Sequence, residues 1–287
     1  MRLLALVVVS LVAIVFVALP LGYAAYAAMP HAREIGPPPE GFANISLIAA
    51  DGVPLAAWYA PSQNGAAIVL VHGGTGSREN VRAHAALLRN AGYGVIAPDL
   101  RGHGESGGGG NAFGWEGTRD IQAAVAHLKA QDEVRAIGGL GLSLGGEVLL
   151  GALNATPALG AVVSEGATHR STTEYLALPD RGNLARSWMP RVLYAGTGVF
   201  TGDAEPVPIA DSIAGAPDVH LLLIAAETEP DEVEYNTHYQ AVAGDRAALW
   251  VVPGGHTGAL AGSPDEYGEQ VGNFFRNALI DRGWSGS

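Results

Sequence analysis

Ser143 is the residue of this sequence best placed to act as a nucleophile. It lies at the centre of residues 141–145, GLSLG, a G-x-S-x-G pattern that follows an apolar run and precedes a helical pattern. A serine at a sharp turn from strand to helix is held in a strained conformation with its hydroxyl exposed. The flanking glycines let strand and helix pass closely, and the first N–H groups of the helix favour an anion. The pattern predicts a nucleophile elbow, although a glycine-rich turn with a capping serine gives the same letters.

His256 is the candidate base for Ser143, because an alcohol is a poor nucleophile at neutral pH. It lies in the glycine-rich turn of residues 253–258, just past the last predicted strand. The alternative is a surface histidine without a role. His169 and His238 have no partner at ligand spacing, so we expect no metal site, and the proposed chemistry calls for no cofactor.

The elements that would position these residues alternate between strands and helices. Continuous aliphatic runs, typical of strands buried on both faces of a sheet, lie at residues 67–71, 94–98, 134–140, 160–164, 219–225 and 248–252. Helical patterns follow at residues 79–90, 118–130, 147–154, 231–243 and 264–279. This alternation predicts an α/β fold with a mainly parallel, doubly wound sheet and right-handed crossovers. Residues 45–60 add two short strands joined by a hairpin turn at Asp51-Gly52.

Four motifs make the chain resemble an α/β-hydrolase. In order, they are HGG at residues 72–74, DLRGHG at 99–104, GLSLG at 141–145 and GGH at 254–256. Each follows a predicted strand, at the edge where open α/β sheets bind ligands. The resemblance covers most of residues 45–280 and implies an α/β-hydrolase fold with serine esterase-like activity. The serine in the elbow argues against the haloalkane dehalogenase and epoxide hydrolase branches, which carry aspartate there.

The resemblance also implies an oxyanion hole made by the backbone N–H groups of Gly74 and Leu144. His72 would hold the loop that carries Gly74 by hydrogen bonds. The polar residues of 99–103 would fix a turn, because their strand is not the one that carries the expected acid.

The acid that completes a Ser-His-acid triad is expected in the loop of residues 226–232, AETEPDE. Related hydrolases often show a Gly-x-x-Asp-Pro pattern there, and aligning its proline with Pro230 puts Glu229 on the acid, in place of the commoner aspartate. Asp231 is the alternative if the loop is longer, and Glu227 or another residue of this loop remains open. Either carboxylate type can orient the histidine.

The N-terminal residues 3–28 form an apolar run of 26 residues without a charge. As a helix this run would be about 39 Å long, enough to span a bilayer with tilt. Tyr23 and Tyr26 lie where an interfacial aromatic belt is expected. A cleaved signal peptide is the alternative, since residues 25–27 read A-x-A, but the apolar core exceeds the usual length.

The predicted orientation places the N-terminus in the cytoplasm and the domain outside. Arg2 precedes the span, whereas Arg33 and Glu34 follow it together, so the positive-inside bias is slight. If the segment is cleaved, the protein is secreted instead.

The rest of the chain divides into a linker at 30–43, rich in proline, and a hydrolase domain at 44–287. The linker is expected to be a stiff extended spacer. Residues 167–208 break the strand–helix alternation with turns and aromatic residues, which predicts a lid insertion over a site.

Composition limits the partners of the chain. Of its 287 residues 48% are hydrophobic, and its net charge of −12 argues against binding nucleic acid through a basic patch. The absence of cysteine excludes disulfides and a cysteine nucleophile.

Together these features predict a membrane-anchored serine hydrolase that cleaves an ester, or else an amide or thioester, of a small-molecule acyl substrate. The alternatives are a non-catalytic, membrane-anchored binding module of the same fold, and an acyltransferase with the same residues.

Overall fold

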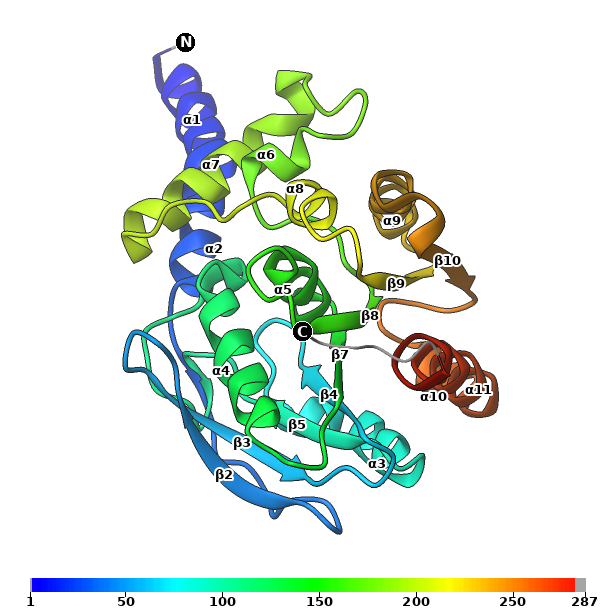
Figure 1. Ribbon diagram of the computed structural model, residues 1–287. Coiled ribbons are helices and arrows are strands. Elements are labelled where there is room, and N and C mark those ends of the chain that lie inside the picture. The colour runs from blue at the N-terminus through cyan, green and yellow to red at the C-terminus, as the bar shows by residue number, and fades with distance from the viewer. Residues whose placement is uncertain (1, 282–287) are drawn as a thin grey trace.

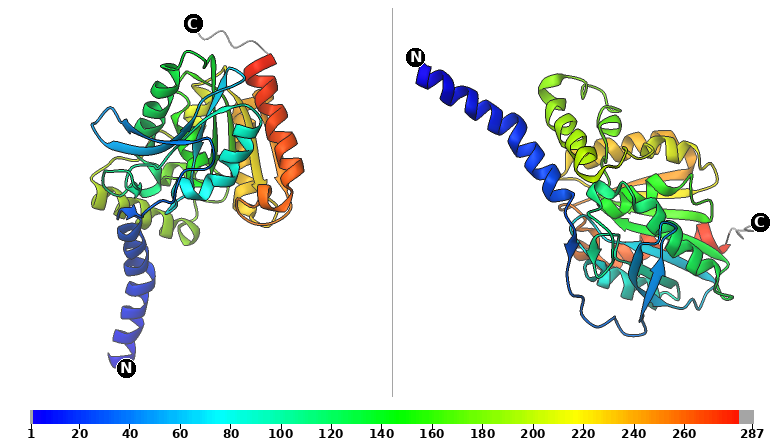
Figure 2. Two further views of the ribbon diagram at one scale, coloured as in Figure 1. Left: turned by 90° about the horizontal axis from the view of Figure 1, so that it is seen from below. Right: turned by 90° about the vertical axis from the view of Figure 1, so that its left-hand side faces the viewer.

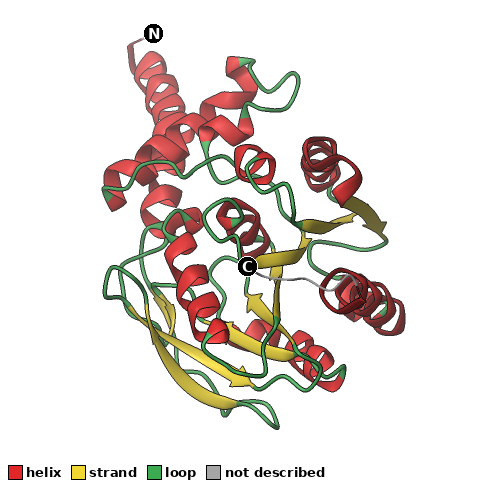
Figure 3. Cartoon of the chain, viewed as in Figure 1, coloured by secondary structure: helices red, strands yellow, loops and turns green. Residues whose placement is uncertain are grey.

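The computed structural model of the protein describes residues 2–281 (Figure 1). Helices cover both faces of a central sheet, as the secondary-structure view shows (Figure 3). This is the α/β architecture with a mainly parallel sheet that the sequence predicts.

Within the described residues the central sheet has eight strands. In spatial order they are β10 (Ala247–Val252), β9 (His220–Ala226), β8 (Leu159–Glu165), β7 (Ala136–Leu142), β4 (Ala66–Val71), β5 (Gly94–Pro98), β3 (Pro54–Ala60) and β2 (Ala43–Ile48). The strands from β10 to β5 pair in parallel, whereas β2 and β3 form the expected hairpin and pair antiparallel. β7 begins two residues later than predicted, because the N–H of Val134 closes a turn with the carbonyl of Gln131 and the pairing with β4 starts at Ala136.

The five predicted helices around the sheet are present, together with two short helices, Ile209–Ala214 and Ala259–Gly262, that the sequence analysis did not predict. They are α3 (Arg82–Asn90), α4 (Gly117–Lys129), α5 (Leu144–Ala152), α8 (Ile209–Ala214), α9 (Pro230–Ala243), α10 (Ala259–Gly262) and α11 (Pro264–Phe275). The region expected as a lid contains α6 (Thr172–Tyr175) and α7 (Leu184–Thr201). Short 3-10 turns lie at η2 (Arg78–Val81), η3 (Ala112–Gly114) and η4 (Gly244–Arg246), and π-helical stretches at η1 (Ile14–Ala18) and η5 (Arg276–Asp281).

The sheet separates two hydrophobic cores. Successive side chains of a strand point to opposite faces, so in β4 Val69 and Val71 pack with α4, α5, α8 and α9, whereas Ile68 and Leu70 pack with α3 and α11. Because both faces are covered, β4 is buried throughout, which explains its uninterrupted aliphatic sequence.

The strand order places the carboxyl ends of β4 and β7 side by side at the centre of the sheet. After β4 the chain passes to β5 on one side, and β7 then lies on the other side of β4. Crevices at such switch points are where open α/β sheets bind ligands.

The N-terminal helix projects from the domain (Figure 2). It comprises α1 (Arg2–Ala13), η1 and α2 (Leu19–Ala27). Among the described residues it contains the one stretch long and apolar enough to cross a membrane, Ser10–Ala27, and little of that stretch is buried. Its last turns pack against α7.

The segment after this helix does not stand free of the domain, as the expected spacer would. β1 (His31–Ala32) pairs in parallel with β6 (His103–Gly104). Further along, Arg82 donates a hydrogen bond to the carbonyl of Pro37 at 2.8 Å. These contacts hold the proline-rich segment along the surface of the domain.

Candidate active site

Ser143 occupies the sharp turn between β7 and α5. Its backbone has φ 52° and ψ −122°, a left-handed conformation that is uncommon for a residue with a side chain. The turn is held because the N–H of Ser143 donates to the carbonyl of Glu165 at 2.7 Å. Strain of this kind persists only where surrounding contacts fix it, and here it presents the serine at the carboxyl edge of the sheet.

The glycines around Ser143 are required by space. A Cβ built on Gly141 would lie 2.4 Å from the backbone of Gly145, and one on Gly145 would lie 2.4 Å from the carbonyl oxygen of Val71. The turn can therefore close only if strand and helix meet without side chains at these two positions.

The loop after β4 lies against the elbow, as the expected oxyanion hole requires. A Cβ on Gly73 would be 3.4 Å from Cβ of Ser143, and one on Gly74 would be 3.8 Å from Cβ of Leu144. Leu144 is the first residue of α5, where a backbone N–H has no acceptor within its own helix. Gly74 and Leu144 thus border the same space beside Ser143.

His72 holds this loop in place through two hydrogen bonds. Its Nδ1 donates to the carbonyl of Gly73 at 2.8 Å, and its Nε2 accepts from the N–H of Leu100 at 3.1 Å. Burial lowers the pKa of His72 to about 4, so the ring is neutral and can serve both bonds at once. These contacts agree with a structural part for His72.

His256 is paired with a buried carboxylate. Its Nδ1 lies 2.5 Å from Oε1 of Glu232, whose side chain is only 4% exposed. This hydrogen bond raises the pKa of His256 despite the opposing effect of its partial burial. With the carboxylate as acceptor, the proton lies on Nδ1 and Nε2 is left as the basic nitrogen. Gly166, with φ 75°, leaves room for the ring, since a Cβ there would lie 3.0 Å from Cε1 of His256.

The partner of His256 differs from the residues expected from sequence. Glu229 is exposed and immediately precedes α9, and Asp231 is exposed and pairs with Arg181 at 2.7 Å. Pro230 is the first residue of α9, so Glu229, which the alignment on that proline puts at the acid position, lies just before the helix. The carboxylate that reaches His256 comes from the first turn of α9 instead.

A sequence signal for Glu232 does exist. The buried polar and aromatic residues of α9 are Glu232, Tyr235, Asn236 and Tyr239, which follow the i, i+3, i+4, i+7 spacing of one helix face. This places Glu232 on the face turned to the sheet, where its Oε2 also accepts from the N–H of Ala226 at 2.9 Å.

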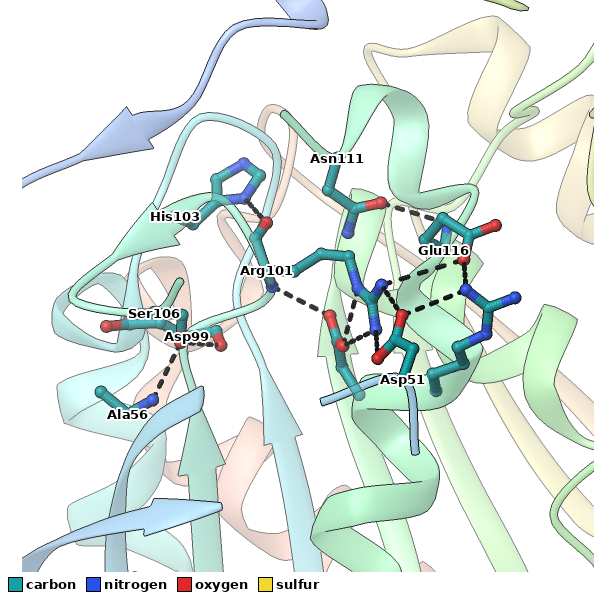
Figure 4. Close-up of polar contacts among 10 residues, drawn as sticks. Asp51, Ala56, Asp99, Arg101, His103, Ser106, Asn111 and Glu116 are labelled. Atoms are coloured by element: carbon teal, nitrogen blue, oxygen red, sulfur yellow. Dashed lines mark hydrogen bonds and ion pairs between the residues drawn. The ribbon is translucent and has the colours of Figure 1, made fainter. Parts of the chain in front are cut away.

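The polar residues of 99–106 form a network that fixes a turn (Figure 4). Asp99 accepts from the backbone N–H of Glu105 at 2.9 Å, and Ser106 donates to the carbonyl of Asp99 at 2.7 Å. Arg101 is held by Asp120 at 2.8 Å and by Asp51 at 2.6 Å. Every one of these contacts joins loop to loop or loop to helix, which agrees with the structural interpretation of this motif.

A cavity of about 800 Å³ joins the pieces of the site. Ser143 and His256 both line it, together with Gly73, Gly74 and the segments around Arg33, His84 and Leu260. In the described residues no group of three or more metal-ligating side chains is present. The arrangement can support nucleophilic attack by Ser143 with His256 as the base.

The chain belongs to the α/β-hydrolases. The sequence model of the family described as serine aminopeptidase, S33, matches residues 62–208, which is just over half of the chain. The matched part includes the loop after β4 and the elbow but ends before Glu232 and His256. A search of curated proteins finds no match.

Solved structures of hydrolases share the fold over most of the chain. Esterase Pf2001 of Pyrococcus furiosus is 21% identical, with a TM-score of 0.69 over 88% of this chain and 98% of the esterase. The α/β hydrolase GrgF of Penicillium sp. sh18 is 16% identical, with a TM-score of 0.65 over 83% and 99%. Esterase RhEst1 of Rhodococcus sp. ECU1013 is 19% identical, with a TM-score of 0.59 over 82% and 99%.

Proposed function

We propose that the protein is a serine hydrolase that cleaves carboxylic esters through an acyl-enzyme. Ser143 is the nucleophile, His256 the general base and Glu232 the acid that orients it. The N–H groups of Gly74 and Leu144 form the oxyanion hole. The single observation that carries this proposal is the bond between His256 and the buried Glu232, beside a strained serine on the same cavity.

The chemistry follows from these positions. Nε2 of His256 takes the hydroxyl proton as Oγ of Ser143 attacks the ester carbonyl. The tetrahedral oxyanion is stabilised by the two N–H groups, and His256 returns the proton to the leaving alkoxide. Water, activated by the same histidine, then attacks the acyl-enzyme and releases the acid.

An ester fits the cavity better than an aminopeptidase substrate. An aminopeptidase must hold the α-ammonium of its substrate, and a carboxylate is the natural partner for that cation. Among the described residues, no Asp or Glu lines the cavity, whereas a cation, Arg33, does. We therefore propose that the substrates are esters and not peptides with a free amino terminus.

We also propose that the N-terminal helix anchors the protein in a membrane with the domain on the extracytoplasmic side. Support comes from the stretch Ser10–Ala27, which is apolar, long enough to span and mostly exposed. Retention of the protein in the membrane fraction after an alkaline wash would test this attachment.

Labelling with a fluorophosphonate probe, combined with turnover of p-nitrophenyl esters of graded chain length, tests the activity. Wild type should react with the probe and hydrolyse the esters, and Ser143→Ala should do neither. Labelling that persists in Ser143→Ala would overturn the nucleophile. A folded wild type that neither reacts nor hydrolyses would instead support a binding module of the same fold.

A further inference from the structure

Arg33 brings a positive charge to the cavity of Ser143. It follows the N-terminal helix by only six residues, yet it lines the cavity together with Ser143 and His256. Among the described residues it is the one arginine or lysine of the lining, and no carboxylate lies there to neutralise it. The cavity thus carries a positive charge although the chain as a whole has a net charge of −12.

The position of Arg33 is fixed from two sides. Its backbone N–H donates to the carbonyl of Gly104 at 2.9 Å, and its Nη2 donates to the carbonyl of Thr75, on the loop after β4, at 2.5 Å. In the part of the chain that the structure describes, no ion pair to Arg33 is found. A guanidinium has five N–H donors, so this arrangement leaves donors that can face a ligand.

We propose that Arg33 binds a carboxylate or phosphate group carried by the substrate, so that the site prefers anionic esters over neutral ones. The proposal rests on the proposed esterase function and adds the substrate class. A planar guanidinium pairs with either anion through two parallel hydrogen bonds. The carbonyl of Thr75 already accepts a hydrogen bond from Arg33 and so fixes the orientation of its guanidinium.

Two pairs of aryl acetates of matched shape test this proposal in the full-length protein. One pair is 4-acetoxybenzoate and its methyl ester, and the other is 4-acetoxyphenyl phosphate and its dimethyl ester. Wild type should show kcat/KM about tenfold higher for the anionic member of at least one pair, and the pair with the larger ratio identifies the anion. Arg33→Gln should remove this preference mainly through KM, and Arg33→Lys should restore part of it. Arg135→Gln, an exposed arginine at the opposite end of β7, is the matched control and should keep it.

A purely structural part for Arg33 predicts another result, because loosening the loop after β4 would slow neutral and anionic esters equally. An unchanged ratio in Arg33→Gln overturns the proposal. Calorimetric binding of the same esters to Ser143→Ala, with and without Arg33→Gln, separates this outcome from failure of the esterase function. If neither ester is cleaved by wild type but the anionic one binds through Arg33, only the proposed chemistry is lost.

Independent observations concern helix α7, which lies against the apolar N-terminal helix. The rings of Trp188 and Phe16 are 4.5 Å apart between centroids, and a Cβ on Gly196 would be 2.7 Å from Cδ2 of Leu21. The N-terminal half of α7 therefore lies beside the part of the N-terminal helix that is farther from the domain. An apolar groove between the two helices is lined by Val15, Leu19, Pro20, Tyr23, Trp188, Met189 and Leu193.

The composition of α7 fits a lipid surface. In its 18 residues it has two arginines and no acidic residue. Its large apolar side chains are open to the outside, with Leu184 70%, Met189 51% and Val199 80% exposed. Arginine and exposed aliphatic residues on one helix are typical of helices that lie in a membrane interface.

We infer that α7 is immersed in the bilayer beside the N-terminal helix, with lipid acyl chains in the groove between them. This rests on the proposed membrane attachment. Phe16 lies inside the candidate span, about 16 Å along the helix from Ala27. A span that crosses the bilayer thus carries Trp188 below the membrane surface, whereas the end of α7 near Val199 lies closer to the domain.

The absence of cysteine makes the test direct, because each single-cysteine variant reports one position. The full-length protein in vesicles, labelled with a fluorophore at Met189→Cys, Val199→Cys, Val12→Cys or Lys129→Cys, is exposed to lipids with spin labels on the acyl chains. Met189→Cys should be quenched several-fold more than Val199→Cys, and exposed Lys129→Cys on α4 should not be quenched. If Val12→Cys is quenched while both α7 positions behave like Lys129→Cys, the anchor stands and this inference is overturned. If none of the four labelled positions is quenched, the proposed membrane anchor and the immersion of α7 are both overturned.

Discussion

Oε1 of Glu232 lies 2.5 Å from Nδ1 of His256, and the two residues come from elements that follow adjacent strands, β9 and β10. The carboxylate is nearly buried, whereas the histidine side chain is 47% exposed. A carboxylate that is withdrawn from water and already bonded to the N–H of Ala226 holds its geometry, so it can orient the more exposed ring.

Glu232→Gln should therefore lower kcat for ester hydrolysis by about 10³–10⁴-fold, as the loss of a triad acid does elsewhere. The amide keeps the shape of the side chain but no longer stabilises the imidazolium. Steady-state kinetics with a p-nitrophenyl ester measures the loss, and thermal unfolding shows whether the variant is folded.

The controls for this change are the two residues expected from sequence. Glu229→Gln and Asp231→Asn alter exposed carboxylates, so each should leave kcat nearly unchanged. A large loss of kcat in either of them, with an active Glu232→Gln, would mean that the triad acid is the substituted residue and not Glu232.

The pH dependence of kcat/KM should report the same pair. A protonated His256 cannot accept the proton of Ser143, so activity rises with pH through the pKa of His256 in the free enzyme. Because Glu232 raises that pKa, the midpoint in wild type should lie above the ordinary value of about 6.5. In Glu232→Gln the residual activity should have its midpoint at lower pH. A midpoint that does not move would assign the acid limb to another group.

Gly145→Ala should disrupt the elbow. The added methyl would lie 2.4 Å from the carbonyl oxygen of Val71, and neither atom belongs to a flexible side chain. Overpacking of this kind costs about 1–3 kcal/mol or more and would displace Ser143 from the cavity. Denaturant unfolding and the rate of fluorophosphonate labelling should both show the change.

The matched variant is Gly272→Ala in α11, where a Cβ meets open space. Alanine there should stabilise the fold by about 0.5–1 kcal/mol, because glycine is a poor residue inside a helix. Equal effects at the two glycines would contradict the close approach at the elbow.

The fold and half of the site could be predicted from local patterns. The aliphatic runs of β4 and β7 show buried strands because both faces of the sheet are covered, and the glycines around Ser143 reflect a close approach within five residues. Ser143 and His256 are candidates on these grounds, since each lies just after a strand, whereas Gly74 was expected from the resemblance to the α/β-hydrolases.

Glu232 could not be found by the same reasoning. Four carboxylates lie within six residues after β9, and which one reaches His256 depends on where α9 begins and which face it buries. The position of Arg33 at the cavity could not be predicted either, because the proline-rich segment that carries it shows no hydrophobic periodicity. Its contacts with Gly104 and Thr75 are set by partners 42 and more residues away.

Glu147, one turn into the helix after Ser143, should make stability depend on pH. Its side chain is buried, and its Oε1 accepts from both the N–H and the hydroxyl of Thr168 at 2.9 Å. Burial raises the pKa of Glu147 from 4.5 to about 7. Between these values the unfolded chain has released the proton that the folded chain still holds, so the free energy of unfolding falls as pH rises, by on the order of 3 kcal/mol.

Glu147→Gln has no proton to release, so its free energy of unfolding should fall less between pH 4.5 and 7 than that of wild type. Denaturant unfolding at several pH values measures both slopes. Glu269→Gln, at an exposed position of α11, is the control and should keep the wild-type slope. Parallel curves for wild type and Glu147→Gln would mean that the carboxylate is already ionised in the folded protein, held by Thr168 against the cost of burial.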